Sequence, residues 1–373
     1  MALTQVRATH RPPELARRLG AVALSLTGFR WLAAGCEAAT ILLTWSLWRV
    51  REAPPMLPAL TLPRVDTGPL LLATLLVVLV RPAAGVALHA AVLLYAMTVD
   101  QTRIQPEVVS LTLLMVGTLP WAWARAIGRA HLIALWCWAG LNKLLSPDFL
   151  GAAGSGRWMA RGLMDHPPGV LLDHFGYAVA LTELATGVLA IVPRTRRAAA
   201  VLALALHGGI LYVLSPLRHD WNEAIWPWNV ALAVAGFAFF WAWRERPLRA
   251  LRGLPAPALA LALAILVSPA LWYVGRWDAY LSHHLYSDSA PVSLRCDASG
   301  AVHARAYPLA EEAPHRQRTN TAAGQGRGVP AECRKQNQSL DAFGAEMSKS
   351  QSNCPAERLA ADENTFGALP QHV

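Results

Sequence analysis

The chain is poor in charged residues and especially in lysine. Only 15% of its 373 residues are Asp, Glu, Lys or Arg, whereas soluble domains usually carry about 25%. Hydrophobic residues make up 54% of the chain, and the mean hydropathy is +0.31. Several apolar runs approach the ~20 residues that a helix needs to cross a bilayer. The composition therefore predicts an integral membrane protein and argues against a single soluble domain.

The sequence also lacks the short motifs of common soluble enzymes. It has no phosphate-binding glycine loop, no nucleophile elbow, no HExxH metal motif and no CxxC pair. We therefore expect no metal, and the adjacent His283 and His284 lack a partner at metal-ligand spacing. Two cysteines, Cys36 and Cys137, lie in apolar runs. In the polar tail, two of Cys296, Cys333 and Cys354 have the option of pairing in an oxidising compartment.

The apolar pattern predicts an all-α fold, a polytopic helical bundle of about nine transmembrane helices followed by a short polar C-terminal tail. Residues 1–28 are expected to form a cytoplasmic arm, because they contain four arginines and no apolar core that would make a cleavable signal peptide. Residues 276–373 are expected to form an extracytoplasmic tail, largely disordered after about residue 309. The expected spans within the transmembrane domain, residues 29–275, are 29–47, 69–81, 83–98, 108–124, 130–145, 176–192, 198–214, 230–243 and 254–274.

The arginines predict the orientation of these spans. The net charge of +9 comes largely from short arginine clusters between apolar runs, near residues 81, 125–129, 194–197 and 244–252. The positive-inside rule places such clusters in the cytoplasm, so the charge is no sign of nucleic-acid binding. With the N-terminus inside, the polar segments 100–107, 146–175 and 215–229 then lie outside, together with the C-terminus. Arg49, Arg51 and Arg64 in the first outer loop depart from this pattern.

Lys143 stands out because it is the only lysine before Lys335. It lies at the end of the expected span 130–145, in the stretch Ala139-Gly140-Leu141-Asn142-Lys143-Leu144. Arginine stays protonated in proteins, whereas a buried lysine is able to lose its proton and act as a base or nucleophile. The alternative is a lysine that only reaches from a helix end to the lipid headgroups.

Other ionisable residues at membrane depth are candidates by default, because such residues are costly there. Glu183 and His207 lie about two turns from the outer ends of their spans and have the same expected depth as Lys143, which predicts a shared acid–base pocket. Alternatively, Glu183 forms an ion pair that holds two helices together, and His207 forms an interhelical hydrogen bond. Asp100 and Arg103 at a helix entrance form either part of a cofactor site or a helix cap with its salt bridge.

The stretch around Lys143, followed by Asp148-Phe149, resembles the vitamin K-dependent gamma-carboxylase superfamily, whose bacterial members carry the HTTM (horizontally transferred transmembrane) domain. In that family an A-G-x-x-K-L run ends a membrane helix, and its lysine is the proposed base that activates a reduced vitamin K. Asp100, the run from Glu183 to Gly187, Leu206-His207 and Trp226-Pro227 occur in the matching order. The family's Asn and His residues in the first polar loop, and its large domain after the helices, are missing here.

The resemblance implies a membrane protein, of the bacterial inner membrane, with an outward-facing pocket in which Lys143, His207 and Glu183 are catalytic. Asp100, Arg103, Trp226 and Asn229 would bind a quinone or another lipid-soluble cofactor. The expected partners are the lipid bilayer and this quinone or lipid substrate, with no nucleic acid. Two alternatives stay open: a non-catalytic membrane scaffold or partner subunit, and a DoxX-like quinone-linked redox subunit.

Overall fold

The computed structural model describes residues 25–50, 58–151, 154–277, 281–283, 292–296 and 302–306. The N-terminal arm before residue 25, the tail after residue 306 and the pairing of Cys333 or Cys354 lie outside these residues. The helices are α2 (Leu26–Leu43), α3 (Thr67–Val80), α4 (Pro82–Val99), α5 (Pro106–Gly117), α6 (Ala122–Leu144), α7 (Pro147–Leu150), α8 (Ser155–Leu163), α9 (Gly169–Ile191), α10 (Arg196–Leu214), α11 (Trp226–Phe240), α12 (Pro247–Arg252) and α13 (Ala256–Val267). Short 3₁₀ helices are η1 (Trp45–Trp48), η2 (Gln101–Arg103), η3 (Glu223–Ile225) and η4 (Ser268–Val274).

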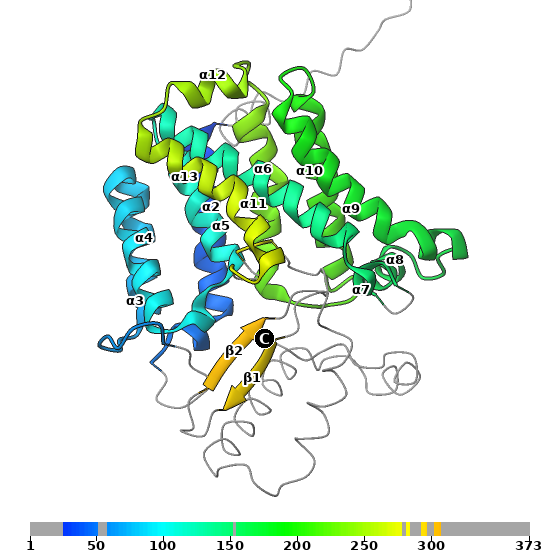
Figure 1. Ribbon diagram of the computed structural model, residues 1–373, viewed down its shortest axis with the longest axis horizontal. Helices are drawn as coiled ribbons and strands as arrows, with labels where there is room; N and C mark the ends of the chain where they lie inside the picture. Colours follow the sequence, from blue (N-terminus) through cyan, green and yellow to red (C-terminus); the bar gives the residue numbers. More distant parts are fainter. Residues whose placement is uncertain are drawn as a thin grey trace, which may run out of the picture.

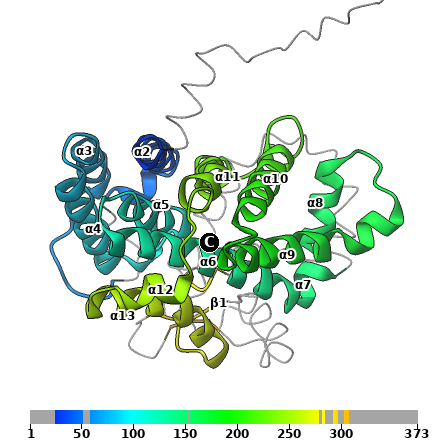
Figure 2. The same ribbon diagram turned by 90° about the horizontal axis from the view of Figure 1, so that it is seen from above.

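The long helices form two layers (Figures 1 and 2). One layer holds α3, α2, α11 and α10, and the other holds α4, α5, α6 and α9, with α13 packed on the outer side of α6. Prolines at the first or second position of α4, α5, α7, α11, α12 and α13 fit this architecture, because a helix start needs no N–H there. Within the two layers, α6 lies at the centre, in contact with α5, α9 and α13.

Five helical segments are long and apolar enough to cross a bilayer: Pro82–Val99, Gly169–Ile191, Arg196–Leu214, Glu223–Phe240 and Ala256–Val274. Large apolar side chains on these and neighbouring helices face outward. Leu76, Leu94 and Leu181 are each more than half exposed. Apolar surface of this kind is stable against lipid, which agrees with an integral membrane protein.

The prediction of about nine spans is not confirmed. Every predicted span contains a helix, but α3 and α5 have only 14 and 12 residues. Two others, α2 and α6, are long enough but carry polar residues that lower their hydropathy, such as Glu37 in α2 and Lys143 in α6. The physical reason is that the Glu37 and Lys143 side chains are buried between helices, where each has a partner on a neighbouring helix. The two helices therefore do not need to be apolar on every face.

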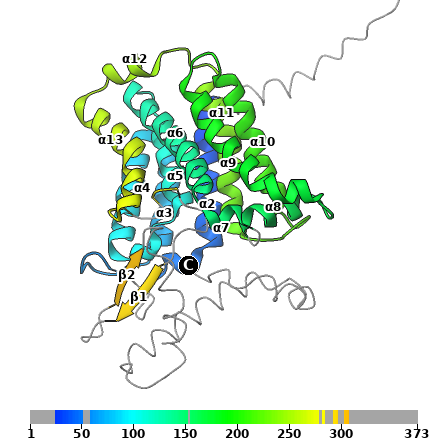
Figure 3. The same cartoon turned by 45° about the vertical axis from the view of Figure 1, so that its right-hand side comes forward.

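The two ends of the bundle differ in chemistry. The turns at Arg81, Arg125–Arg129 and Arg194–Arg197, together with α12, lie at one end, which we call the arginine end. The end of α6 at Lys143, η2, α7, α8 and η3 lie at the other, the polar end (Figures 1 and 3). The predicted alternation of basic and polar turns is therefore present in the fold. The polar segment 146–175 contains the short helices α7 and α8.

The described bundle is all-helical, as predicted. Beyond it, strands β1 (Val292–Cys296) and β2 (Val302–Ala306) pair in an antiparallel sheet, with Val292 opposite Ala306. The strands lie beside the polar end (Figure 3).

Candidate functional site

Lys143 and Glu183 form a buried ion pair at the polar end of the bundle. The Lys143 Nζ atom donates to Glu183 Oε2 at 2.8 Å, and both residues are only 5% exposed. Lys143 is in the last turn of α6, and Glu183 is in the middle of α9. The structure therefore brings together the first two predicted site residues, which are 40 positions apart in the chain.

The pair can form because α6 and α9 approach closely. A Cβ atom on Gly140 would lie 2.5 Å from the Leu184 backbone nitrogen and 2.7 Å from the Ala180 carbonyl oxygen. A Cβ on Gly187 would lie 2.5 Å from Cys137 Sγ. Only glycine fits at such distances, and small residues at a helix interface are how membrane helices bring their backbones together.

Polar and aromatic groups surround this pair. Asn142 Nδ2 donates to the Ser282 carbonyl oxygen at 2.7 Å, and the Tyr273 hydroxyl donates to Asn142 Oδ1 at 2.5 Å. The Phe149 ring centroid lies 5.8 Å from Lys143 Nζ. The chain turns sharply after α6, where Ser146 Oγ accepts from the Phe149 backbone N–H and caps α7. This turn holds the aromatic ring next to the amine.

His283 lies near the same site. Burial, and secondarily the charge of Lys143, lower the pKa of His283 to about 4, so the ring is neutral at neutral pH. Its ring centroid is 5.8 Å from that of His131, whose Nε2 is hydrogen-bonded to Ser110 Oγ at 2.7 Å. His131 of α6 is thus in contact with both His283 and Ser110 of α5.

His207, in α10, contacts α6 at Trp136, two helical turns before Lys143. The Trp136 indole N–H, which can only donate, points to His207 Nε2 at 3.0 Å. Nδ1 must therefore carry the proton and donate to Asn229 Oδ1 at 2.9 Å. Asn229 Nδ2 in turn donates to the Ile225 carbonyl oxygen. A neutral His207 thus joins α6, α10 and α11, the arrangement of the interhelical alternative, and its two ring nitrogens bond to Trp136 and Asn229 instead of Lys143.

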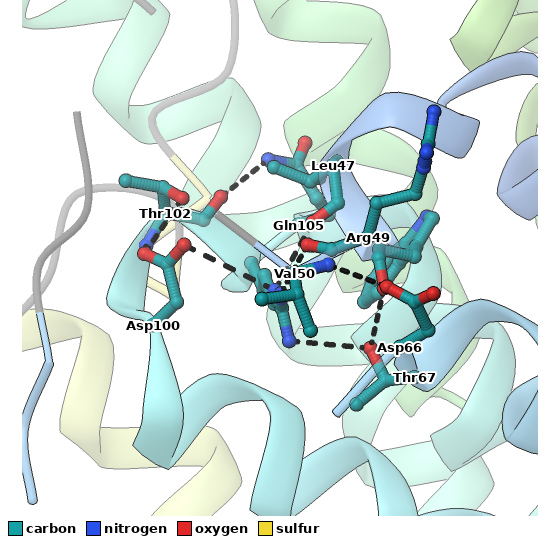
Figure 4. A network of polar contacts seen from close by, with 10 residues as sticks. Leu47, Arg49, Val50, Asp66, Thr67, Asp100, Thr102 and Gln105 are labelled. Atoms are coloured by element: carbon teal, nitrogen blue, oxygen red, sulfur yellow. Dashed lines mark hydrogen bonds and ion pairs between the residues drawn. The ribbon is translucent and has the colours of Figure 1, made fainter. Parts of the chain in front are cut away.

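Asp100 and Arg103 form a separate network at the polar end, drawn in Figure 4. Asp100 Oδ1 accepts from the Thr102 backbone N–H at 3.1 Å and the Thr102 hydroxyl at 2.8 Å, so it caps η2. Arg103 Nε lies 4.0 Å from Asp100 Oδ2.

The Arg103 guanidinium also holds the chain between α2 and α3. Its nitrogens donate to the carbonyl oxygens of Leu47 at 3.0 Å and Arg49 at 2.8 Å, and to the Thr67 hydroxyl at 3.2 Å. These contacts fix the loop that precedes α3, which is the arrangement of the cap-and-salt-bridge alternative.

Trp226 begins α11, and its indole N–H donates to the Trp221 carbonyl oxygen at 3.1 Å. It lies at the polar end beside η3, one turn before Asn229. The seven predicted site residues therefore fall into three groups along the polar end: Lys143 with Glu183; His207 with Asn229, near Trp226; and Asp100 with Arg103.

A further buried network, between α2, α3, α4 and α5, was missed by the sequence analysis. Glu37 Oε1 accepts from the Thr112 hydroxyl at 3.0 Å and lies 2.7 Å from His89 Nε2. His89 Nδ1 lies 2.7 Å from the Thr74 hydroxyl, whose own proton goes to the Leu71 carbonyl oxygen. Glu37 and His89 are both fully buried. The rule that singled out Glu183, an ionisable residue inside a span, would have found them.

No group of three or more His, Cys, Asp or Glu in the described ranges is arranged to hold a metal ion. Comparison with known proteins finds no matching family model, no matching curated protein and no matching solved structure.

Proposed function

We propose that the protein is a membrane enzyme in which the Lys143–Glu183 pair removes a proton from the hydroxyl of a lipid-soluble hydroquinone. The observation that carries the proposal is the 2.8 Å contact between a buried amine and a buried carboxylate in a membrane bundle. Buried pairs of an acid and a base are a common feature of catalytic sites. The resemblance of the Lys143 stretch to the gamma-carboxylase superfamily points to the same residue.

The chemistry needs one proton shift before the substrate reacts. Transfer of a proton from Lys143 to Glu183 turns the ion pair into a neutral amine and a carboxylic acid. The amine then accepts the hydroxyl proton of the hydroquinone, which leaves a quinolate and a Lys143 ammonium. Glu183 holds the first proton until it is released to solvent. Lysine supports this cycle because its amine has a neutral form, which the arginine guanidinium does not reach in proteins.

The surroundings of the pair support a ring-shaped, largely apolar substrate. The Phe149 ring lies 5.8 Å from the amine, and the residue before Lys143 in α6, Asn142, is hydrogen-bonded to Tyr273. Tyr273 belongs to η4, at the end of an apolar segment long enough to cross the bilayer. A lipid-dissolved quinol would thus approach from the membrane. We place the polar end outside the cytoplasmic membrane and the arginine end inside, in accordance with the positive-inside rule.

The test is menaquinol oxidation by purified protein in lipid nanodiscs under air. Quinolates reduce dioxygen faster than neutral quinols, so base catalysis gives quinone and hydrogen peroxide in equal amounts. Lys143→Arg keeps a cation beside Glu183 but removes the base, so we expect the rate to fall by about 10²-fold or more. Arg129→Lys is the matched control, since it alters a cation that contacts Trp243 and the Phe239 carbonyl at the arginine end.

Equal rates for wild type and Lys143→Arg would overturn the proposal. So would a wild-type rate that does not exceed that of empty nanodiscs. Either outcome would favour the scaffold hypothesis, which has its own support in the structure. The Lys143–Glu183 contact joins α6 to α9, and His207 joins α6, α10 and α11, so both predicted catalytic clusters also hold helices together.

A further inference from the structure

The arginine end carries strong positive charge. Residues 118–129, 192–198 and 241–255 contain a single acidic residue, Glu245. Their basic residues are all arginines: Arg125, Arg129, Arg194, Arg196, Arg197, Arg244, Arg246, Arg249 and Arg252. An excess of this size creates a field that attracts anions, and within a membrane protein the nearest anions are lipid headgroups.

Some of these arginines are committed to the fold. Arg196 is 1% exposed, and its guanidinium donates to the carbonyl oxygens of Ala190, Ile191, Trp243 and Glu245. Arg196 therefore ties the end of α9 to the chain after α11, and its donors are used within the protein.

Arg197, the next residue, has a different environment. It is exposed, and its guanidinium carbon lies 5.3 Å from the centroid of the Trp241 ring. Among the described residues no hydrogen bond or ion pair engages this guanidinium. Stacking on an aromatic face leaves the N–H groups along the guanidinium edge available to an anion.

An apolar groove of about 440 Å³ starts at Arg197 and Trp241. Four of its residues, from Ala198 to Ala205, recur at helical spacing on one face of α10. The apolar lining residues are Leu189, Ala198, Val201, Leu202 and Ala205. From Ala198 to Ala205 the helix rises about 10 Å, which is a length suited to part of an acyl chain.

From this geometry we infer that the groove binds an anionic glycerophospholipid, with its phosphate at Arg197 and one acyl chain along α10. Two independent features meet at one place: an exposed guanidinium for a phosphate, and a shallow, open apolar groove along α10. Arginine matches phosphate with paired N–H donors. The tryptophan at the rim is typical of the membrane interface. The inference does not depend on the Lys143 site, which lies at the opposite end of the bundle.

The experiment is native mass spectrometry of the detergent-purified protein, titrated with dioleoyl-phosphatidylglycerol or dioleoyl-phosphatidylcholine. We expect wild type to bind phosphatidylglycerol more tightly. Arg197→Gln should weaken phosphatidylglycerol about fivefold, the usual effect of one basic residue near anionic lipid. Its effect on phosphatidylcholine should be smaller, because the choline cation offsets the charge of the phosphate. Arg249→Gln removes an exposed arginine of α12 outside the groove and should stay within about twofold of wild type.

A second pair of variants tests the binding of the acyl chain in the groove without altering charge. Ala205→Trp fills the groove and should reduce phosphatidylglycerol binding as much as Arg197→Gln does. Leu204→Trp, at an exposed position next to it that does not line the groove, should bind like wild type. Equal binding of the two lipids to wild type would overturn the inference. Loss of binding in both arginine variants alike would also overturn it, because the effect would then come from the overall charge.

Discussion

Buried cations in this protein are held in two different ways. The Arg103 and Arg196 guanidinium groups each donate to several backbone carbonyl oxygens. A guanidinium suits this role because it has five N–H donors and stays protonated. Lys143 instead donates to the Glu183 carboxylate, which is itself ionisable. A proton can move within this pair, whereas it cannot move between a guanidinium and a carbonyl group. This difference gives a physical reason for a lysine at position 143, in a chain that uses arginine for nearly all its other positive charges.

The first prediction concerns the stability of this pair. Lys143→Met leaves the Glu183 carboxylate buried without its partner and should lower the free energy of unfolding by about 3–5 kcal/mol. The double variant Lys143→Met/Glu183→Gln removes both charges and should recover most of that loss. A double-mutant cycle, measured by chemical unfolding in detergent, gives the coupling between the two residues. Additive effects would show that the two side chains do not interact.

The second prediction concerns His219, in the turn after α10. Its ring stacks on Trp158 with centroids 4.0 Å apart, and its Nε2–H donates to the Trp158 carbonyl oxygen at 3.0 Å. Burial lowers the pKa of His219, and the charge of Arg218 adds to this effect. Because the folded state disfavours the charged ring, the associated stability is present above the unfolded pKa of about 6.5 and is lost as the pH falls below it.

Melting temperatures of wild type and His219→Gln between pH 8 and pH 5 would measure this effect. The wild type should lose more stability on acidification than the variant. Parallel pH profiles of the two proteins would show that His219 does not contribute to the pH dependence.

Among the helices, α6 has the central role, because it contributes a residue to three polar contacts near the candidate site. Trp136 contacts His207, Asn142 contacts the Ser282 carbonyl oxygen and Lys143 contacts Glu183. The distance between the Lys143 amine and the Glu183 carboxylate therefore depends on how α6 is placed against α9. That position depends on the close contact at Gly140.

The third prediction follows from this contact. Gly140→Ala places a Cβ against the backbone of α9, which cannot move aside as a flexible side chain would. The variant should be destabilised by about 1–3 kcal/mol and should weaken the Lys143–Glu183 coupling. Gly35→Ala in α2 is the matched control, because no atom lies within 4 Å of its added Cβ. Alanine favours helix over glycine by about 1 kcal/mol, so the control should be neutral or slightly stabilising.

Thermal unfolding in the same detergent compares the two glycine variants directly. If Gly140→Ala and Gly35→Ala changed stability equally, the close approach of α6 and α9 would not control the site.

Across the whole molecule, the two ends of the bundle have opposite characters. Arginine-rich turns gather at one end, and the candidate site with its polar neighbours lies at the other (Figure 1). Any chemistry at Lys143 is therefore separated from the arginine end by the thickness of the bundle. The proposed lipid site and the proposed acid–base site would act on opposite faces of the membrane.

The fourth prediction is the topology of the chain. Green fluorescent protein fused after Arg81, Arg194 or Arg249 should fluoresce, because each of these positions is expected in the cytoplasm, where this reporter folds. Fusions after Arg103, Asp165 and Arg218 should instead give an active alkaline phosphatase, which needs an oxidising compartment. This pattern at the six positions requires α4, α9, α10 and α11 to cross the membrane. The same reporter response at Arg81 and Arg103 would show that α4 does not cross.

The sequence alone determined the helical class, the approximate place of each long helix and the alternation of basic and polar turns. These properties depend on local hydropathy and charge, which are read directly along the chain. It also singled out Lys143 and Glu183, because an ionisable residue in an apolar run is conspicuous. The number of spans was not determined in this way, since α2 and α6 contain polar residues that only their interior position explains.

The tertiary structure decided which polar groups meet. Lys143 contacts Glu183 and not His207, because the glycine contact between α6 and α9 sets their register while Trp136 and Asn229 use both nitrogens of His207. The Glu37–His89 contact joins residues 52 positions apart. Partners so far apart are brought together by helix packing, and helix packing depends on the shapes of all the contacting surfaces at once.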